Sequence, residues 1–222
     1  MKREFHLDWS YVIDRYPLLV KGLGMTILIS LLGMALALVL GLLIASMRMS
    51  KYRPLNWLAQ LYINIFRAIP LFVFIIWMYY GLPIVAMGID FDPITAGVLC
   101  LALQYAGWLA EIYRSGIGAI GKGQREAALS LGLTRFQTFV DVIFPQAFKI
   151  MLPPMGNNFV GMLKDSSLVG IIGVFELVRQ AQLAVSQTFR PFEFYTAIAI
   201  VYIILTQLLS QGVNYLERRQ HA

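Results

Sequence analysis

Charge, cysteine and histidine are all scarce in this chain of 222 residues, and each scarcity excludes a class of protein. Charged residues make up 14% of the chain and hydrophobic residues 59%, so a water-soluble globule would lack the polar surface needed to cover itself. The single cysteine, Cys100, lies in an apolar run, which excludes an intrachain disulfide and a cysteine metal cluster. The two histidines, His6 and His221, are near opposite ends of the chain. We therefore expect neither a metal site nor a histidine-based active site.

Two short motifs are also missing. There is no G-x-x-x-x-G-K-[ST] phosphate loop, so the chain is not expected to bind ATP by such a loop. The segment from Met1 to Lys21 carries seven charges and lacks a short apolar core, so we predict no cleavable signal peptide. The net charge of +6 could indicate nucleic acid, but the basic residues lie mostly beside apolar runs. That placement is typical of membrane orientation, and no nucleic-acid partner is expected.

The sequence is rich in long apolar runs, which predict an all-α, polytopic integral membrane protein. The clearest run, Met25 to Met47, is 23 residues without a charge, about 34 Å of helix and long enough to cross a bilayer. The run at Ile150 to Leu163 is too short alone, and Lys164 and Asp165 separate it from the next apolar stretch. We predict one transmembrane domain over 1–222, with spans at 25–47, 57–81, 93–111, 150–175 and 194–216 and a cytoplasmic loop at 112–149.

Basic residues next to the spans predict which ends face the cytoplasm. Arg48, Lys51 and Arg53 follow the first span, and Glu217-Arg218-Arg219 follows the last. An odd number of spans then places the amino terminus outside and Arg179 and Arg190 in outer loops. Lys and Arg residues before the first span disagree with that orientation, and aromatic residues among them suggest an interfacial helix on the outer leaflet: Trp9, Tyr11, Ile13 and Tyr16. Models with four or six spans remain open.

The polar loop has the start and stop signals of two short helices. Gly123 can begin a helix with Glu126 near the positive end of its dipole, and Gly132 can end it in a left-handed cap. Thr134 and Gln137 fit a capping box for a second helix toward Val140. Ala127 and Ala128 would present small side chains for close docking to another protein.

These same residues resemble the EAA loop of bacterial ABC importer permeases. The resemblance rests on Glu126-Ala127-Ala128, then Gly132, then Ile143-Phe144-Pro145-Gln146-Ala147. The strings Lys122 to Ala128 and Lys164-Asp165-Ser166-Ser167-Leu168 are similar to the branch that imports histidine, glutamine and other polar amino acids. The segment Phe66 to Leu71 is also similar, although Ala68-Ile69 stands where the family more often has Gly-Thr.

The resemblance implies a permease fold with five transmembrane helices, multi-pass in the bacterial inner membrane. It implies that a separate ATPase binds ATP and magnesium, that this chain binds no cofactor, and that ATP-driven closure of the ATPase produces alternating access. Further partners would be a second permease copy or homologue, a periplasmic or lipid-anchored amino-acid-binding protein, and membrane lipid. The residues expected to couple to the ATPase are Glu126, Ala127, Ala128, Gly132 and Pro145.

Charges inside spans cost about 2.5 to 3.5 kcal/mol each on insertion scales, so those that occur here need a reason. An amino-acid zwitterion needs a donor for its carboxylate and an acceptor for its ammonium, and Arg67 and Asp165 have those signs. Both could instead be structural, Arg67 by snorkelling and Asp165 by pairing within the chain. Uncharged polar residues at comparable depth complete the predicted substrate path: Gln104, Asn157, Asn158, Ser166 and Ser167. Pro153, Pro154 and Gly156 are expected to break or kink the entry to the fourth span.

Asn158 lies about two turns before Asp165, so only one carboxylate is predicted on that helix face. This weakly favours neutral or acidic amino acids, such as glutamine, glutamate or cystine, over arginine and lysine. The main alternative function is a passive channel or facilitator for small polar solutes, which would not need the loop. An intramembrane enzyme is disfavoured, because no span has a histidine or a pair of carboxylates.

Overall fold

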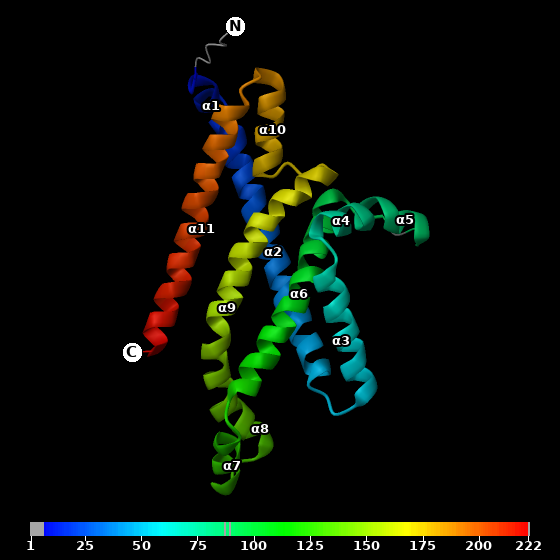
Figure 1. Cartoon of the computed structure of the whole chain (residues 1–222), viewed down its shortest axis with the longest axis vertical. Coiled ribbons are helices and arrows are strands. Elements are labelled where there is room, and N and C mark those ends of the chain that lie inside the picture. Colours follow the sequence, from blue (N-terminus) through cyan, green and yellow to red (C-terminus); the bar gives the residue numbers. More distant parts are fainter. Residues whose placement is uncertain (1–6, 87, 89, 222) are drawn as a thin grey trace. The chain divides into compact units, whose positions relative to one another are not determined.

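Helices are the only regular secondary structure in the part of the chain that the structure describes. The computed structural model describes residues 7–86, 88 and 90–221, and no strand occurs within them. Figure 1 shows the helices along the chain. The longer α-helices are α2 (Tyr16–Arg48), α3 (Arg53–Ala68), α6 (Pro93–Ala119), α9 (Phe144–Asp165), α10 (Leu177–Thr188) and α11 (Pro191–His221). The shorter elements are α1 (Ser10–Asp14), α4 (Leu71–Ile76), η1 (Trp77–Gly81), α5 (Leu82–Val85), α7 (Lys122–Ser130), α8 (Arg135–Gln137), η2 (Thr138–Ile143) and η3 (Ser166–Ile172).

Three described helices are long and apolar enough to cross a membrane, or up to five if each of two bent pairs forms one span. The first bent pair joins α3 to the segment Leu71–Val85 at 102°. The sequence predicted one span over 57–81, and the helix breaks within it, because Ile69 is extended at φ −77 and ψ 126. Pro70 explains the break, because its ring disfavours helical geometry in the residue before it.

The second bent pair joins the run Arg135–Ile172 to α10 at 50°. Here the expectation of a break at the prolines is wrong, because α9 continues through Pro153 and Pro154. The predicted second short helix of the loop is likewise not separate, since α8 and η2 lead directly into α9. The change of geometry falls at Asp165, where α9 gives way to the 3-10 helix η3.

The amino-terminal part differs from expectation in length. α2 begins at Tyr16, so the first apolar helix is longer than the predicted 25–47. The expected interfacial helix is reduced to the five-residue α1, beside which Trp9 contacts Phe192 edge-on at 6.5 Å between ring centroids. Arg179 lies in α10 and not in a loop, contrary to the prediction.

The chain folds into two compact units, each built from three separate stretches of sequence. Unit 1 comprises 1–33, 71–101 and 162–208, and unit 2 comprises 34–70, 102–161 and 209–222. In unit 1, one apolar cluster joins α2, α10 and α11; its buried members are Leu19, Leu177, Ala181, Ala184, Phe194 and Ile198.

Also in unit 1, Asp92 precedes α6 and accepts hydrogen bonds from the backbone of Ile94 at 3.0 Å and Thr95 at 3.1 Å. Hydrogen bonds from Thr95 lower the pKa of Asp92.

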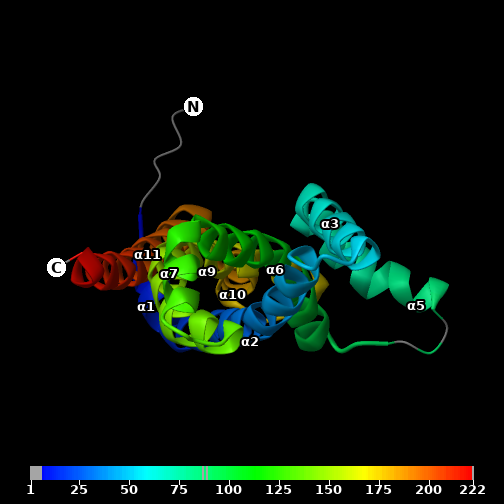
Figure 2. The ribbon, with the colours of Figure 1, turned by 90° about the horizontal axis from the view of Figure 1, so that it is seen from below.

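Unit 2 contains the helical hairpin formed by α7, α8 and η2. α7 packs against η2, which continues directly from α8. Figure 2 shows α7 in the view from below. Elsewhere in unit 2, α6 and α9 approach so closely that glycine is needed at position 116. A Cβ on Gly116 would lie 2.2 Å from Cγ of Met151. The chain enters the hairpin from α6 and leaves it into α9, and these two helices meet at Gly116 and Met151.

Candidate functional site

The hairpin ends α7 as the sequence predicts. Gly132 has φ +85, the left-handed conformation that glycine adopts without strain. The N–H of Leu133 donates to the carbonyl of Ala128 at 3.2 Å, and that of Gly132 to Leu129 at 3.0 Å. These two bonds form the Schellman motif, which satisfies carbonyls at the end of a helix. The loop after α7 therefore has a fixed conformation.

The second helix of the hairpin begins with the predicted capping box. The backbone N–H of Gln137 donates to Oγ1 of Thr134 at 3.3 Å, and the backbone N–H of Thr134 donates to Oε1 of Gln137 at 2.9 Å. η2 then follows as a π-helix. It lies just before Pro145. Proline has no N–H, so Pro145 cannot donate the helical hydrogen bond to the carbonyl of Asp141, and a wider helical turn accommodates that lost bond.

Two details of α7 correct the prediction. The helix begins at Lys122, with Gly121 as its N-cap, so Glu126 is the fifth helical residue and lies beyond the first turn. The favourable interaction with the helix dipole that we expected for Glu126 falls off within that turn. Ala128 is 4% exposed, buried by the chain itself, whereas Ala127 is exposed. Only Ala127 of the pair is on the surface.

The hairpin also exposes large apolar side chains. Leu131 is 82% exposed and Phe136 76%, and their neighbours with more than a third of their surface exposed are Leu129, Phe139 and Val140. A cluster of this kind on a polar segment is typical of a surface that another protein covers. Glu126 and Ala127 belong to the same short helix.

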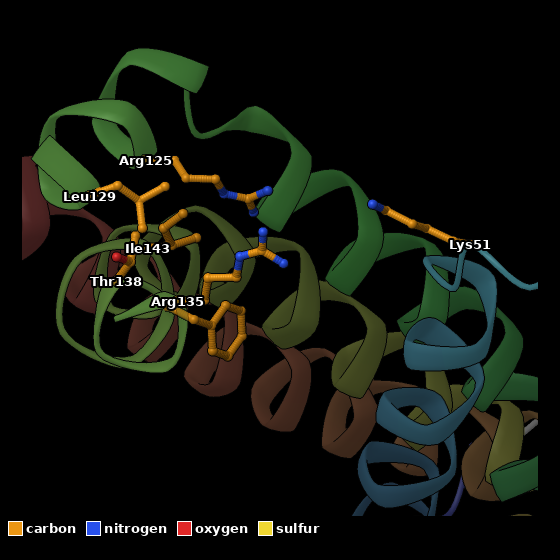
Figure 3. A pocket seen from close by; sticks show the side chains of 7 residues that line it. Lys51, Arg125, Leu129, Arg135, Thr138 and Ile143 are labelled. Atoms are coloured by element: carbon orange, nitrogen blue, oxygen red, sulfur yellow. The ribbon is translucent and has the colours of Figure 1, made fainter. Parts of the chain in front are cut away.

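A cavity of about 480 Å³ lies beside the hairpin in unit 2. Its lining includes Lys51 from the α2–α3 connection, Arg125 from α7 and Arg135 from α8, and none of its lining residues is acidic. Figure 3 shows the charged ends of these three side chains directed toward one another. Thr138 also lines it, and the Thr138 hydroxyl is buried without a hydrogen-bond partner among the described residues.

Arg67 lies at the end of α3, where the predicted second span bends. Its guanidinium carbon is 4.0 Å from the ring centroid of Trp108 on α6, within the range of a cation–π interaction. The Arg67 side chain is exposed in this single chain. Sequence reasoning did not identify Trp108 as a partner, because the two residues are 41 positions apart.

Gln104 on α6 holds the bend between α3 and α4. Its Nε2 donates to the carbonyl of Ile69 at 2.8 Å, the residue at which the helix breaks. Freed carbonyls in a membrane must find such a donor, because no water replaces it. The other amide atom, Oε1 of Gln104, is buried with no partner among the described residues.

The remaining predicted path residues fall in both units. In unit 2, Asn157 is exposed and Asn158 donates from Nδ2 to the carbonyl of Pro154 at 3.0 Å. In unit 1, Asp165 is half-buried, and Ser166 is fully buried with Oγ donating to the carbonyl of Leu163 at 2.8 Å. Ser167 is half-buried. Within unit 2, Gln104 and Arg67 both lie at the end of α3. Gln104 donates to the carbonyl of Ile69, and Arg67 belongs to the last turn of α3.

Unit 1 has a buried carboxylate that sequence reasoning missed. Glu176 is 0% exposed and caps α10, accepting from the backbone N–H of Val178 at 2.8 Å and of Arg179 at 2.6 Å. Oγ1 of Thr26 accepts from the N–H of the next residue, Leu177, at 3.1 Å. The sequence does contain a signal that could have predicted this cap, namely an acidic residue directly before an amphipathic run. No group of three potential metal-ligating residues occurs within 7–86, 88 and 90–221.

Known proteins resemble this chain over nearly its whole length. Residues 37–222 match the model of the family described as "Binding-protein-dependent transport system inner membrane component". The chain is 41% identical to the glutamine transport system permease protein of Escherichia coli (strain K12), over 96% of this chain and 97% of that one. It is 39% identical to a Bacillus subtilis (strain 168) protein named "Probable glutamine ABC transporter permease protein", over 96% and 98%. A solved structure titled "Crystal structure of an amino acid ABC transporter with histidines" is 40% identical, with a TM-score of 0.90 over 97% of this chain and 100% of that one.

Proposed function

Because the chain belongs to the family of binding-protein-dependent transport system inner membrane components, we propose that it carries a neutral or acidic polar amino acid, glutamine first. The chain is the permease subunit of an ABC importer of polar amino acids and is not itself an enzyme. The observation that carries the proposed substrate is the pair of glutamine permeases to which it is similar over 96% of its length. Asn158 supports it, because a second carboxylate there would favour a dicationic substrate.

Importers of this kind work with an ATPase and a substrate-binding protein. We propose that the ATPase, carrying ATP and magnesium, docks on the exposed surface around Glu126, Ala127, Leu131 and Phe136. Fixed caps at both helices of the hairpin support this, because a rigid element can transmit the closure of the ATPase to α6 and α9. Gly132 would act by shaping this surface. Pro145 would act through η2, the helical turn before α9, and Ala128 would act as a core residue of the hairpin.

For the membrane assembly, we propose five spans over the ranges now given by α2, α3 with α4–α5, α6, α9 with η3, and α11. The chain would lie in the bacterial inner membrane with its amino terminus outside. Five helices are too few to enclose an alternating pathway, so a second permease copy or homologue would complete it. An amino-acid-binding protein, periplasmic or lipid-anchored, would deliver the substrate from outside.

For the substrate path, we propose Arg67, Gln104, Asn157, Asn158, Asp165, Ser166 and Ser167. The free Oε1 of Gln104 offers an acceptor for the substrate ammonium, and Arg67 offers a donor for its carboxylate. The Asp165→Asn substitution keeps the size of the side chain and removes the charge. We expect it to abolish uptake while the ATPase remains bound, and unchanged uptake kinetics would remove Asp165 from the path.

The test of the function is a screen of radiolabelled amino acids with the complex reconstituted in vesicles. We expect ATP-dependent uptake of glutamine, with glutamate and cystine next and with arginine and lysine weaker. The matched control uses an ATPase subunit disabled in hydrolysis. Uptake that continues in that control would indicate a passive facilitator, and transport of a sugar or metal alone would refute the amino-acid assignment.

A further inference from the structure

The cavity lined by Lys51, Arg125 and Arg135, here called the basic cavity, has no counter-charge from the described part of the chain. No acidic residue lines it, and none of the three cations forms an ion pair or a side-chain hydrogen bond among the described residues. Their charged ends nevertheless point toward one another (Figure 3). Like charges held together repel, so the arrangement favours binding of an anion.

The rest of the lining indicates an anion with an apolar part. Thr138 is 2% exposed, and its hydroxyl lacks a hydrogen-bond partner among residues 7–86, 88 and 90–221. A buried polar group of this kind costs free energy until it is paired. The remaining lining side chains are apolar, namely Leu129, Phe139 and Ile143. Three cations, one spare hydroxyl and an apolar wall suit a phosphate ester joined to a hydrophobic body.

The position of Lys51 relates the basic cavity to the membrane surface. Lys51 is in the short connection between α2 and α3, and it also lines a second cavity of about 240 Å³ with Arg53, Asn56 and Trp57. The Trp57 side chain is 63% exposed. Exposed tryptophan at the end of an apolar helix typically lies at the level of lipid head groups. The basic cavity thus begins at that level and extends to the hairpin.

We propose that the basic cavity binds the head group of an anionic phospholipid from the cytoplasmic leaflet. Basic pockets at the cytoplasmic ends of membrane helices are suited to such head groups. A bound phosphodiester would neutralise Lys51 on the α2–α3 connection together with Arg125 and Arg135 on the hairpin. It would thereby hold the hairpin against that connection, and energy coupling would depend on the anionic lipid content of the membrane.

The test measures lipid retained by the delipidated permease–ATPase complex, using native mass spectrometry with phosphatidylglycerol or with phosphatidylcholine of the same chains. We expect the native complex to retain phosphatidylglycerol preferentially. The Arg125→Gln/Arg135→Gln variant should bind it about 25-fold more weakly, at about fivefold per cation, with phosphatidylcholine unchanged. The matched control, Lys149→Gln/Arg218→Gln, removes two charges outside the lining and should bind normally.

Further arms decide between lipid and other anions. Lys51→Gln lies outside the hairpin, so its expected fivefold loss stays measurable if the double variant fails to assemble. Equal retention of both lipids by the native complex would overturn the proposal. So would competition by inorganic phosphate as effective as that by phosphatidylglycerol, which would indicate a free anion. Loss of ATPase from the double variant with unchanged lipid retention would assign the basic cavity to an acidic segment of the ATPase instead.

Discussion

At the scale of single residues, two polar side chains predicted for the substrate path also donate hydrogen bonds to backbone carbonyls. Gln104 donates to Ile69 where α3 ends, and Asn158 donates to the carbonyl of Pro154, one turn earlier in the same helix. Neither bond uses the carbonyl oxygen of the amide side chain. Each side chain can therefore hold the backbone and still accept a hydrogen bond from a ligand.

Replacement of Gln104 by leucine should expose this structural role. The Gln104→Leu variant leaves the Ile69 carbonyl without its donor, and we expect a loss of about 1 to 2 kcal/mol in the free energy of unfolding. An exposed glutamine of α11, Gln207, gives the control, since Gln207→Leu should change stability by less than about 0.5 kcal/mol. Thermal unfolding of the detergent-solubilised protein measures both. Equal stability of the two variants would contradict the role of the Gln104–Ile69 bond.

At the scale of single elements, the end of α7 depends on the conformation of one glycine. A Cβ at Gly132 would meet no atom within 4 Å, so the strain of Gly132→Ala arises from its φ of +85 alone. We expect a cost of about 1 kcal/mol and amide hydrogen exchange in α7 about fivefold faster. The control Gly123→Ala also meets open space but lies in regular helix, where alanine is favourable. Slower or unchanged exchange in Gly132→Ala would refute the left-handed cap.

Between elements of unit 1, α6 and η3 approach closely at Gly97. A Cβ there would lie 2.2 Å from Cγ1 of Val169, so Gly97→Ala should destabilise the protein by about 1 to 3 kcal/mol. Adding Val169→Ala should recover part of that loss, which a double-mutant cycle of unfolding midpoints measures. Gly24→Ala, with nothing within 4 Å, is the control. Strict additivity of the two substitutions would show that the predicted clash does not form.

At the scale of the whole molecule, the proposed orientation can be tested with single cysteines. Cys100 is fully buried, and Cys100→Ala provides a cysteine-free background. We expect a cysteine at Ser10 to react with an impermeant maleimide in intact spheroplasts, and one at Ser130 only after the membrane is opened. Both serines are exposed. Reaction of both positions in intact spheroplasts, or of neither, would contradict an odd number of spans between Ser10 and Ser130.

The sequence by itself determined the class of the molecule and the local form of the hairpin. Apolar run lengths depend only on composition, and the caps at Gly132, Thr134 and Gln137 depend on residues within one or two helical turns. The polar interruption at Lys164 and Asp165 is local as well, and α9 ends there. The family resemblance indicated importer function for the same reason, because each of its motifs is a short contiguous stretch of sequence.

Only the tertiary structure decided which side chains meet across elements. Arg67 against Trp108, Gln104 against Ile69, and Lys51 beside Arg125 and Arg135 each join distant positions, which periodicity cannot pair. The burial of Ala128 and Glu176 depends on neighbouring helices in the same way. Whether Pro153 and Pro154 break a helix is likewise set by the packing around it. Local sequence determines conformation within a turn or two. Contacts between residues distant in sequence form only when the whole chain buries its apolar groups and pairs its polar groups.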